Sequence, residues 1–175
     1  TLEYEMGATS ACWYWFDEIH KKIGANRFDI VSCNPPYFKY IESSNINKND
    51  YLTIARHEVK ATLEDIIIES KKLLNDGGYL YMVHRCDRFS EICEAFSKNC
   101  LQIKTLRFVF SKTTSEEALF VLIEARKNKN PGMKILKPLY IYNENNSYTD
   151  EVLKNVDSYD ETSAYPYVLV TNKFP

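Results

Sequence analysis

The sequence predicts an α/β fold built on a mostly parallel sheet with an antiparallel hairpin at its edge. Short apolar, β-branched runs alternate with a segment of helical periodicity, which is typical of parallel strands joined by helices. Two later β-rich runs are separated by only a few polar residues, a spacing that favours an antiparallel pair. The chain has 175 residues, 45% of them hydrophobic, enough to bury the core of one domain.

The first expected strand covers residues 28–33 (FDIVSC), and the Asn-Pro-Pro sequence that follows ends it abruptly. Residues 38–55 are rich in serine, asparagine and aspartate and predict a long surface loop. Apolar residues then recur at helical spacing over residues 58–75, and Gly77-Gly78 is the expected stop signal. The sequence thus predicts a strand, a loop and a helix in succession.

A second buried strand is expected at residues 79–84 (YLYMVH), followed by a helix with Asp87 as its N-cap. The apolar stripe expected on that helix consists of Phe89, Ile92, Cys93, Phe96 and Cys100. Residues 101–110 and 118–125 form the predicted hairpin. Residues 133–142 predict one further strand, and a last apolar run lies at residues 167–170.

Composition excludes several classes of protein. With 22 Lys and Arg against 24 Asp and Glu, the chain is no polybasic nucleic-acid binder. It has no apolar run long enough to span a membrane, so no membrane partner is expected. The five cysteines include no C-x-x-C pair, which predicts no metal site and a reducing compartment, the cytoplasm. With only five glycines, neither G-x-G-x-x-G nor a P-loop can be written.

Asn34-Pro35-Pro36-Tyr37 is the sharpest functional signal, because it directly follows a buried strand. Ligands of α/β sheets bind at the carboxyl ends of strands. Two prolines remove two N–H donors, so the turn is rich in acceptors, namely carbonyls and the Asn34 side-chain oxygen. Such a turn suits a substrate NH₂ group, with Tyr37 as a flat face for a planar ring. The alternative is a plain strand-ending turn with a buried tyrosine.

At these residues the sequence resembles the class I S-adenosylmethionine (SAM)-dependent amino-methyltransferases, whose N-P-P-Y motif follows a strand of a Rossmann-like sheet. Further similarity, from about Phe28 to about Tyr148, points to the bacterial tRNA adenine-N6 methyltransferases, which modify an adenine next to the anticodon of a valine tRNA. The matching segments are FDIVSCNPPYF, ARHE (Ala55–Glu58), LLNDGG, YLYMVHR, LRFVFSK, EALFVLIEARK and PLYIY.

The resemblance implies a Rossmann-like sheet, SAM as cofactor and tRNA as partner. In such an enzyme the target adenine is turned out of its stack, and its N6 donates hydrogen bonds to Asn34 and to the Pro35 carbonyl while Tyr37 stacks on the ring. These three are the expected catalytic residues, and Asn34 also faces the cofactor. Pro36 and Phe38 are expected to widen the substrate wall, although a core role for Phe38 is equally open.

The chain also departs from the family. The glycine-rich cofactor turn and the acidic ribose contact lie upstream of N-P-P-Y in the family, and only 33 residues precede Asn34 here. We therefore expect a C-terminal fragment whose first strand, 28–33, is left as a sheet edge in need of a partner. Asp17 is the one candidate for a further cofactor contact, with an ordinary surface carboxylate as the alternative.

A local basic segment is the candidate RNA surface. Residues 98–137 hold nine lysines and arginines and three glutamates, between two acidic segments. Its cluster Arg126, Lys127 and Lys129 is expected to contact phosphates, with a solvated charged face as the alternative. Arg56 and His57 of the ARHE run are also expected to contact RNA, unless they pack at the helix start.

The predicted organisation is a methyltransferase region at residues 28–148 between an unassigned N-terminal segment, 1–27, and an unassigned tail, 149–175. Two other functions stay open. A protein glutamine N5-methyltransferase, acting on a release factor, shares the N-P-P-Y motif. The chain could also be a cofactor-less module that only binds a planar ligand in the same pocket.

Overall fold

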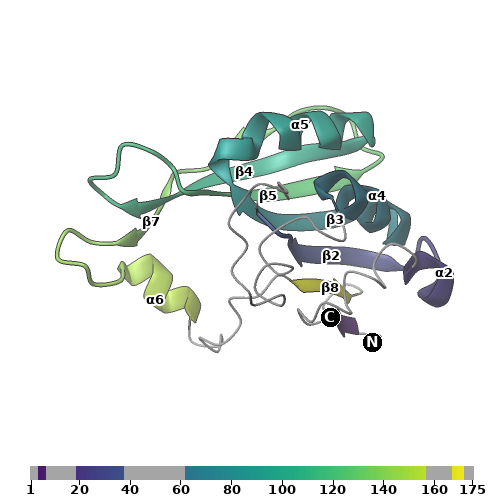
Figure 1. Cartoon of the computed structure of the whole chain (residues 1–175), viewed down its shortest axis with the longest axis horizontal. Helices are drawn as coiled ribbons and strands as arrows, with labels where there is room; N and C mark the ends of the chain where they lie inside the picture. Colours follow the sequence, from purple (N-terminus) through teal and green to yellow (C-terminus); the bar gives the residue numbers. More distant parts are fainter. Residues whose placement is uncertain (1–3, 7–18, 38–61, 157–166, 172–175) are drawn as a thin grey trace, which may run out of the picture.

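The computed structural model describes residues 4–6, 19–37, 62–156 and 167–171 (Figure 1). Eight strands form one mixed sheet in the order β1-β8-β2-β3-β5-β4-β6, with β7 also paired to β4. The strands are β1 (Tyr4–Met6), β2 (Phe28–Asn34), β3 (Leu74–Arg85), β4 (Leu101–Lys112), β5 (Phe120–Lys127), β6 (Lys134–Ile135), β7 (Leu139–Tyr142) and β8 (Tyr167–Thr171). The helices are α2 (Ile19–Ile23), α4 (Leu63–Leu73), the 3-10 turn η1 (Cys86–Arg88), α5 (Phe89–Lys98) and α6 (Asp150–Val156).

Helix α4 links the parallel strands β2 and β3, as the sequence predicts. It starts with a capping box, in which the Asp65 N–H donates to the Thr62 hydroxyl and the Thr62 N–H donates to the Asp65 carboxylate. The expected Gly77-Gly78 stop is wrong. The helix ends at Leu73 because Leu74 is already extended and pairs with Phe28, so that β3 begins without a turn between them. Residues 75–78 are accommodated by a register shift between β2 and β3.

The second strand-helix unit differs from its prediction at both ends of the helix. Asp87 is not the N-cap of α5, because its carboxylate accepts a hydrogen bond of 3.0 Å from Arg85 Nε and lies within η1. Ile92 and Phe96 are buried as expected. Cys100 is not part of the apolar stripe, since it is exposed and has a positive φ of 55° beyond the end of the helix.

The predicted hairpin is confirmed, with β4 and β5 antiparallel. The expected strand at 133–142 forms two short strands, β6 and β7, that both run parallel to β4. Between β6 and β7 the chain leaves the hydrogen-bonded ladder. There the carbonyls of Lys137 and Pro138 accept hydrogen bonds from the Arg107 side chain of β4. These short strands place the hairpin one position in from the edge of the sheet.

Strand β2 has a hydrogen-bonded partner strand on each side. β3 pairs with it in parallel, and β8 pairs with it antiparallel, from Ile30 opposite Thr171 to Asn34 opposite Tyr167. The expectation that the strand at 28–33 needs a partner is therefore confirmed. β1 continues the sheet beyond β8, so segments from both ends of the chain join it.

Helices α4 and α5 lie on the same face of the sheet (Figure 1). Their apolar residues and the inward-facing strand residues form one core, which includes Val31, Ile66, Leu80, Ile92 and Ile123. Fully buried side chains of this kind stabilise the fold by roughly 1.5 to 3 kcal/mol each. The neighbouring Cys33 is also buried, which raises its thiol pKa to about 12 and keeps it protonated. None of the helices in the described part of the chain has the length and apolar character to cross a bilayer.

Candidate substrate site at the end of strand β2

The N-P-P-Y turn lies where β2 leaves the sheet. Asn34 is the last residue of β2, Pro35 and Pro36 are buried, and Tyr37 is half-buried. Prolines can be buried here at low cost because they bring no N–H group that would need a partner. The turn therefore presents oxygen acceptors at the carboxyl end of a parallel strand, the usual place for ligands in α/β sheets.

Asn34 and Tyr37 are in direct contact. The Tyr37 hydroxyl donates a hydrogen bond of 2.5 Å to Asn34 Oδ1. This bond orients the amide so that its oxygen, and not its nitrogen, faces the tyrosine. An amide oxygen has two lone pairs, so Asn34 can accept a second hydrogen bond from a substrate N–H group.

The Tyr37 ring packs against residues from the two strands beyond β2. Its centroid lies 5.4 Å from that of His84 on β3, edge to face, and 5.5 Å from that of Phe120 on β5. Both distances are in the favourable range for aromatic pairs. Neighbouring strands of the sheet thus fix the direction of a side chain that the sequence alone assigns to stacking.

His84 is fully buried beneath this ring. Burial, together with the nearby Arg88 guanidinium, lowers its pKa to about 4, so the imidazole is neutral near pH 7. Its Nδ1 lies 3.4 Å from the Arg85 carbonyl oxygen, and its Nε2 has no hydrogen-bond partner among the residues that the structure describes. A polar ring at the end of an apolar run is the signal that could have pointed to this position.

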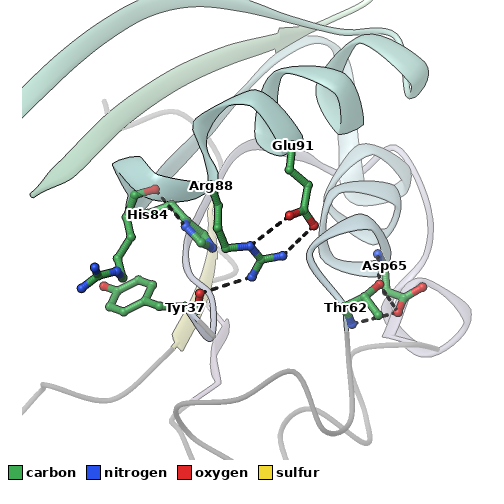
Figure 2. Close-up of polar contacts among 7 residues, drawn as sticks. Tyr37, Thr62, Asp65, His84, Arg88 and Glu91 are labelled. Carbon is green, nitrogen blue, oxygen red and sulfur yellow. Dashed lines mark hydrogen bonds and ion pairs between the residues drawn. The ribbon is translucent and has the colours of Figure 1, made fainter. Parts of the chain in front are cut away.

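Arg88, at the start of α5, reaches the turn from the other side (Figure 2). Its Nη1 donates to the Tyr37 carbonyl oxygen at 3.3 Å, and its Nε and Nη2 donate to Glu91 at 3.2 and 2.7 Å. Neither Arg88 nor Glu91 is among the site residues that the sequence predicts. Their spacing of three residues at a helix start was the available signal, but it says nothing of a contact with Tyr37.

A pocket of about 560 Å³ lies next to this end of the sheet. It is formed by Arg85, Cys86 and Asp87 after β3 and by the β4–β5 connection, including Leu119. Phe120, which contacts the Tyr37 ring, follows Leu119 directly. The pocket is thus one residue along the chain from the Phe120 contact with Tyr37, and residues 34–37 themselves do not line it.

The basic cluster expected to bind RNA is not part of this site. Arg126 pairs with Tyr79, the sixth residue of β3, whereas Phe120 pairs with Arg85, its last residue. Six residues of strand separate these two pairs, about 20 Å at the usual rise per residue. Along the strands, Arg126 lies toward the end opposite to the one where Asn34 lies. Its guanidinium stacks 4.3 Å from the Tyr79 ring and donates to the Gly77 carbonyl.

Lys127 is a correction to the predicted phosphate contacts. Only 7% of its surface is exposed, and its Nζ donates to Asn26 Oδ1 at 2.6 Å and to the Leu74 carbonyl at 2.7 Å. Desolvation by burial lowers its pKa. Its ammonium group therefore joins the Asn26 turn to the start of β3 and does not face solvent. Lys129, by contrast, is exposed.

Four further predicted site residues, Asp17, Phe38, Arg56 and His57, lie outside the described residues. Asn34 is therefore the one expected cofactor contact that the described part of the chain places. Gly77 and Gly78 lie in the first half of β3, toward the end of the strands opposite to Asn34.

Comparison with known proteins extends the resemblance seen in the sequence. No family model matches the chain. Two tRNA1(Val) (adenine(37)-N6)-methyltransferases, from Porphyromonas gingivalis strains W83 and ATCC 33277, are each 34% identical over 97 and 98 residues, which is 55% of this chain. The matched region spans only 34% of each relative's length.

Among solved structures, a predicted O-methyltransferase from Agrobacterium tumefaciens superimposes with a TM-score of 0.59 at 18% identity. The match covers 78% of this chain and 54% of that protein. At this identity the likeness concerns the fold. The chain accordingly has a methyltransferase-like α/β fold and is similar in sequence to tRNA adenine-N6 methyltransferases over about half of its length.

Proposed function

We propose that this chain is the target-base region of a SAM-dependent methyltransferase that modifies N6 of an adenine in tRNA, in the cytoplasm. The observation that carries the proposal is the oriented Asn34 oxygen at the carboxyl end of β2, held by the Tyr37 hydroxyl. The names of the Porphyromonas gingivalis relatives support the same substrate. Because the match spans about a third of those proteins, the activity and the tRNA partner are proposals for this chain.

The chemistry follows from the acceptors of the turn. The adenine N6 group donates one hydrogen bond to the free lone pair of Asn34 Oδ1 and one to the Pro35 carbonyl. These bonds hold the nitrogen in place and increase its electron density, and positioning of this kind supplies much of the rate of a transfer reaction. When bound, SAM supplies an electrophilic methyl group. Transfer would break the sulfonium S–CH₃ bond and leave N6 with one proton to release to solvent, while Asn34 Oδ1 and the Pro35 carbonyl would hold the nitrogen in place.

For the cofactor itself, the described residues provide little. A phosphate- or ribose-binding turn needs glycines with free backbone groups near the site. Gly77 and Gly78 are about a strand's length away, and the Gly77 carbonyl is occupied by Arg126. We therefore assign no described residue other than Asn34 to SAM.

Substrate charge separates this proposal from a protein glutamine N5-methyltransferase. A glutamine amide offers the same NH₂ donors as adenine, so the acceptor turn fits both. An RNA substrate carries phosphates, and its binding weakens steeply as salt rises, whereas a protein substrate without such a charge shows little dependence. A module that only holds a planar ligand would bind but transfer no methyl group.

The test is a transfer assay with a catalytically competent form of this protein, tritiated SAM, and unmodified valine tRNA or a release factor as acceptor, because we expect the 175-residue chain by itself to bind SAM weakly. We expect label in the tRNA only, recovered as N6-methyladenosine after digestion, and none with Asn34→Ala. Arg27→Gln is the matched control, because Arg27 also donates to a backbone carbonyl, that of Ile23, and directly precedes β2, at the opposite end of the strand from the turn. Label in the release factor would favour a protein glutamine N5-methyltransferase.

A binding assay decides the substrate if the chain transfers no methyl group by itself. It compares an RNA hairpin carrying one loop adenosine with the same hairpin carrying purine riboside, which lacks the N6 amino group. A site that accepts hydrogen bonds from that group binds the adenosine form more tightly, by at least about tenfold. Equal affinities for the two hairpins would contradict the proposal that the substrate is an adenine.

A further inference from the structure

We propose that Arg88 is a positioning residue of the substrate site, which sets the place of the Asn34 acceptor by holding the Tyr37 carbonyl. This inference rests on the proposed function. Arg88 is the last residue of η1, directly before α5, lies 51 residues from Tyr37 along the chain, and is not part of the N-P-P-Y motif.

Glu91 orients the Arg88 side chain. Two of the guanidinium nitrogens, Nε and Nη2, donate to the two Glu91 carboxylate oxygens, and the side chain of Arg88 is only 11% exposed. A fork of this kind fixes the guanidinium plane more firmly than a single contact. The remaining nitrogen, Nη1, then lies at a defined place, 3.3 Å from the Tyr37 carbonyl oxygen (Figure 2).

The Tyr37 carbonyl is an effective point to hold. Pro35 and Pro36 have no N–H groups, so the backbone that follows Asn34 has fewer donors with which to anchor itself. From Tyr37 the side chain reaches back and donates to Asn34 Oδ1. A shift of the Tyr37 backbone is therefore passed to the Asn34 oxygen through the packed ring and the hydrogen bond from its hydroxyl.

The competing explanation is that Arg88 and Glu91 form an ordinary ion pair in the first turn of α5. The same helix offers a comparison in Lys98 and Glu94, whose side chains are 60% and 65% exposed. Exposed pairs of that kind contribute little. The Arg88 pair differs in being shielded and in having a third contact on another element, which a purely helix-stabilising pair does not need.

The contact can be measured directly, because Tyr37-Phe38 is the one Tyr-Phe step in the sequence. Labelling tyrosine carbonyls with ¹³C and phenylalanine amides with ¹⁵N gives a single cross-peak in a carbonyl-amide NMR spectrum of the chain. We expect Arg88→Gln to shift this carbonyl resonance upfield, since the carbonyl loses a charged donor. The matched control Arg27→Gln removes another carbonyl-binding arginine, which donates to Ile23 before β2, and leaves the resonance in place.

The consequence for the substrate is tested with the adenosine and purine riboside hairpins. We expect the adenosine preference to fall from at least about tenfold to less than about threefold in Arg88→Gln, and to be retained in Arg27→Gln. Arg88→Lys keeps one donor without the fork and should fall between. It also serves as the second variant if Arg88→Gln does not fold.

The outcomes separate the two claims. A wild-type chain without adenosine preference overturns the proposed function, whatever the NMR shows. With a wild-type preference in hand, an unmoved carbonyl resonance in Arg88→Gln overturns the Arg88 contact. A shifted resonance with full adenosine preference overturns the positioning role of Arg88. A shifted resonance together with a reduced adenosine preference supports the inference.

Discussion

The hydroxyl of Tyr37 donates a hydrogen bond of 2.5 Å to the side-chain oxygen of Asn34, three residues earlier. The residue that provides the expected stacking face thus also orients the expected acceptor. Motif chemistry alone assigns Tyr37 a ring and Asn34 an oxygen as separate contributions. In the folded chain the two are coupled, and variants at either position affect the same acceptor.

Asn34→Ala should abolish most of the methyl transfer of a catalytically competent form of this protein. It removes the acceptor that holds the attacking nitrogen, and the loss of a comparable transition-state contact lowers kcat by about 100-fold or more. Steady-state kinetics with tRNA would measure this, with the KM for SAM changing far less. Near-normal turnover in a folded Asn34→Ala protein would contradict the assignment of the turn.

Tyr37→Phe keeps the ring and removes only the hydroxyl. Because the Asn34 amide then loses the donor that orients it, we expect kcat to fall by about tenfold, close to the net value of one hydrogen bond. Tyr37→Ala also removes base stacking worth about 1 to 3 kcal/mol and should weaken RNA binding as well. Unchanged turnover in Tyr37→Phe would show that the ring face alone matters.

His84 should make the fold sensitive to acid. Its pKa is lowered from 6.5 to about 4 in the folded chain, so both states are neutral above pH 6.5. As the pH falls toward 4, the unfolded state takes up the proton first, and the free energy of unfolding decreases by up to about 3 kcal/mol. Urea unfolding between pH 7 and 4 measures this decrease.

The matched variants for that experiment are His84→Gln and His20→Asn. The first should flatten the pH dependence, because it removes the group that titrates. The second alters the other described histidine, which pairs with Glu69, and should retain most of the decrease. A pH profile that is the same in His84→Gln as in the wild type would assign the acid sensitivity to other groups.

Lys127 and Lys129 should differ sharply in their effect on stability. Lys127→Met leaves the Leu74 carbonyl and the Asn26 side chain without their donor, which costs about 1 to 3 kcal/mol of unfolding free energy. Lys129→Met changes an exposed side chain and should stay within about 0.5 kcal/mol of the wild type. Urea denaturation of both variants provides the comparison, and equal stabilities would refute the buried role of Lys127.

Lys129 is the member of the basic cluster left to contact phosphate. Lys129→Glu should weaken tRNA binding and lower the slope of log affinity against log salt by about 0.7 to 0.9, the value of one lost phosphate contact. Filter binding at several salt concentrations measures the slope. If the slope is unchanged, this segment is a solvated charged face.

Isolated, the 175-residue chain should bind SAM weakly, with a Kd above about 100 μM, a binding free energy smaller than about 5.5 kcal/mol. Its five glycines include no G-x-G motif, and the Gly77-Gly78 pair lies far from Asn34. Calorimetric titration, with a full-length tRNA adenine-N6 methyltransferase as positive control, measures the affinity. Low-micromolar binding would mean that residues outside the described part hold the cofactor.

The type and order of the main elements were predictable from the sequence. The run at 28–33, the helical spacing before Leu73 and the two β-rich runs around the hairpin all depend on side chains a few residues apart, which is where local periodicity acts. The N-P-P-Y turn could be placed at a strand end for the same reason, because proline cannot continue a parallel ladder.

Only the tertiary structure decided which distant groups meet. Arg88 reaches Tyr37 across 51 residues and Lys127 reaches Asn26 across 101, while β8 pairs with β2 from near the end of the chain. These contacts depend on strand order and register, which place residues side by side irrespective of their separation in sequence. A lysine that the sequence predicts to contact phosphate is therefore buried, and an arginine with no motif of its own contacts the N-P-P-Y turn. Pairing of whole strands, and not local spacing, sets the surroundings of both residues.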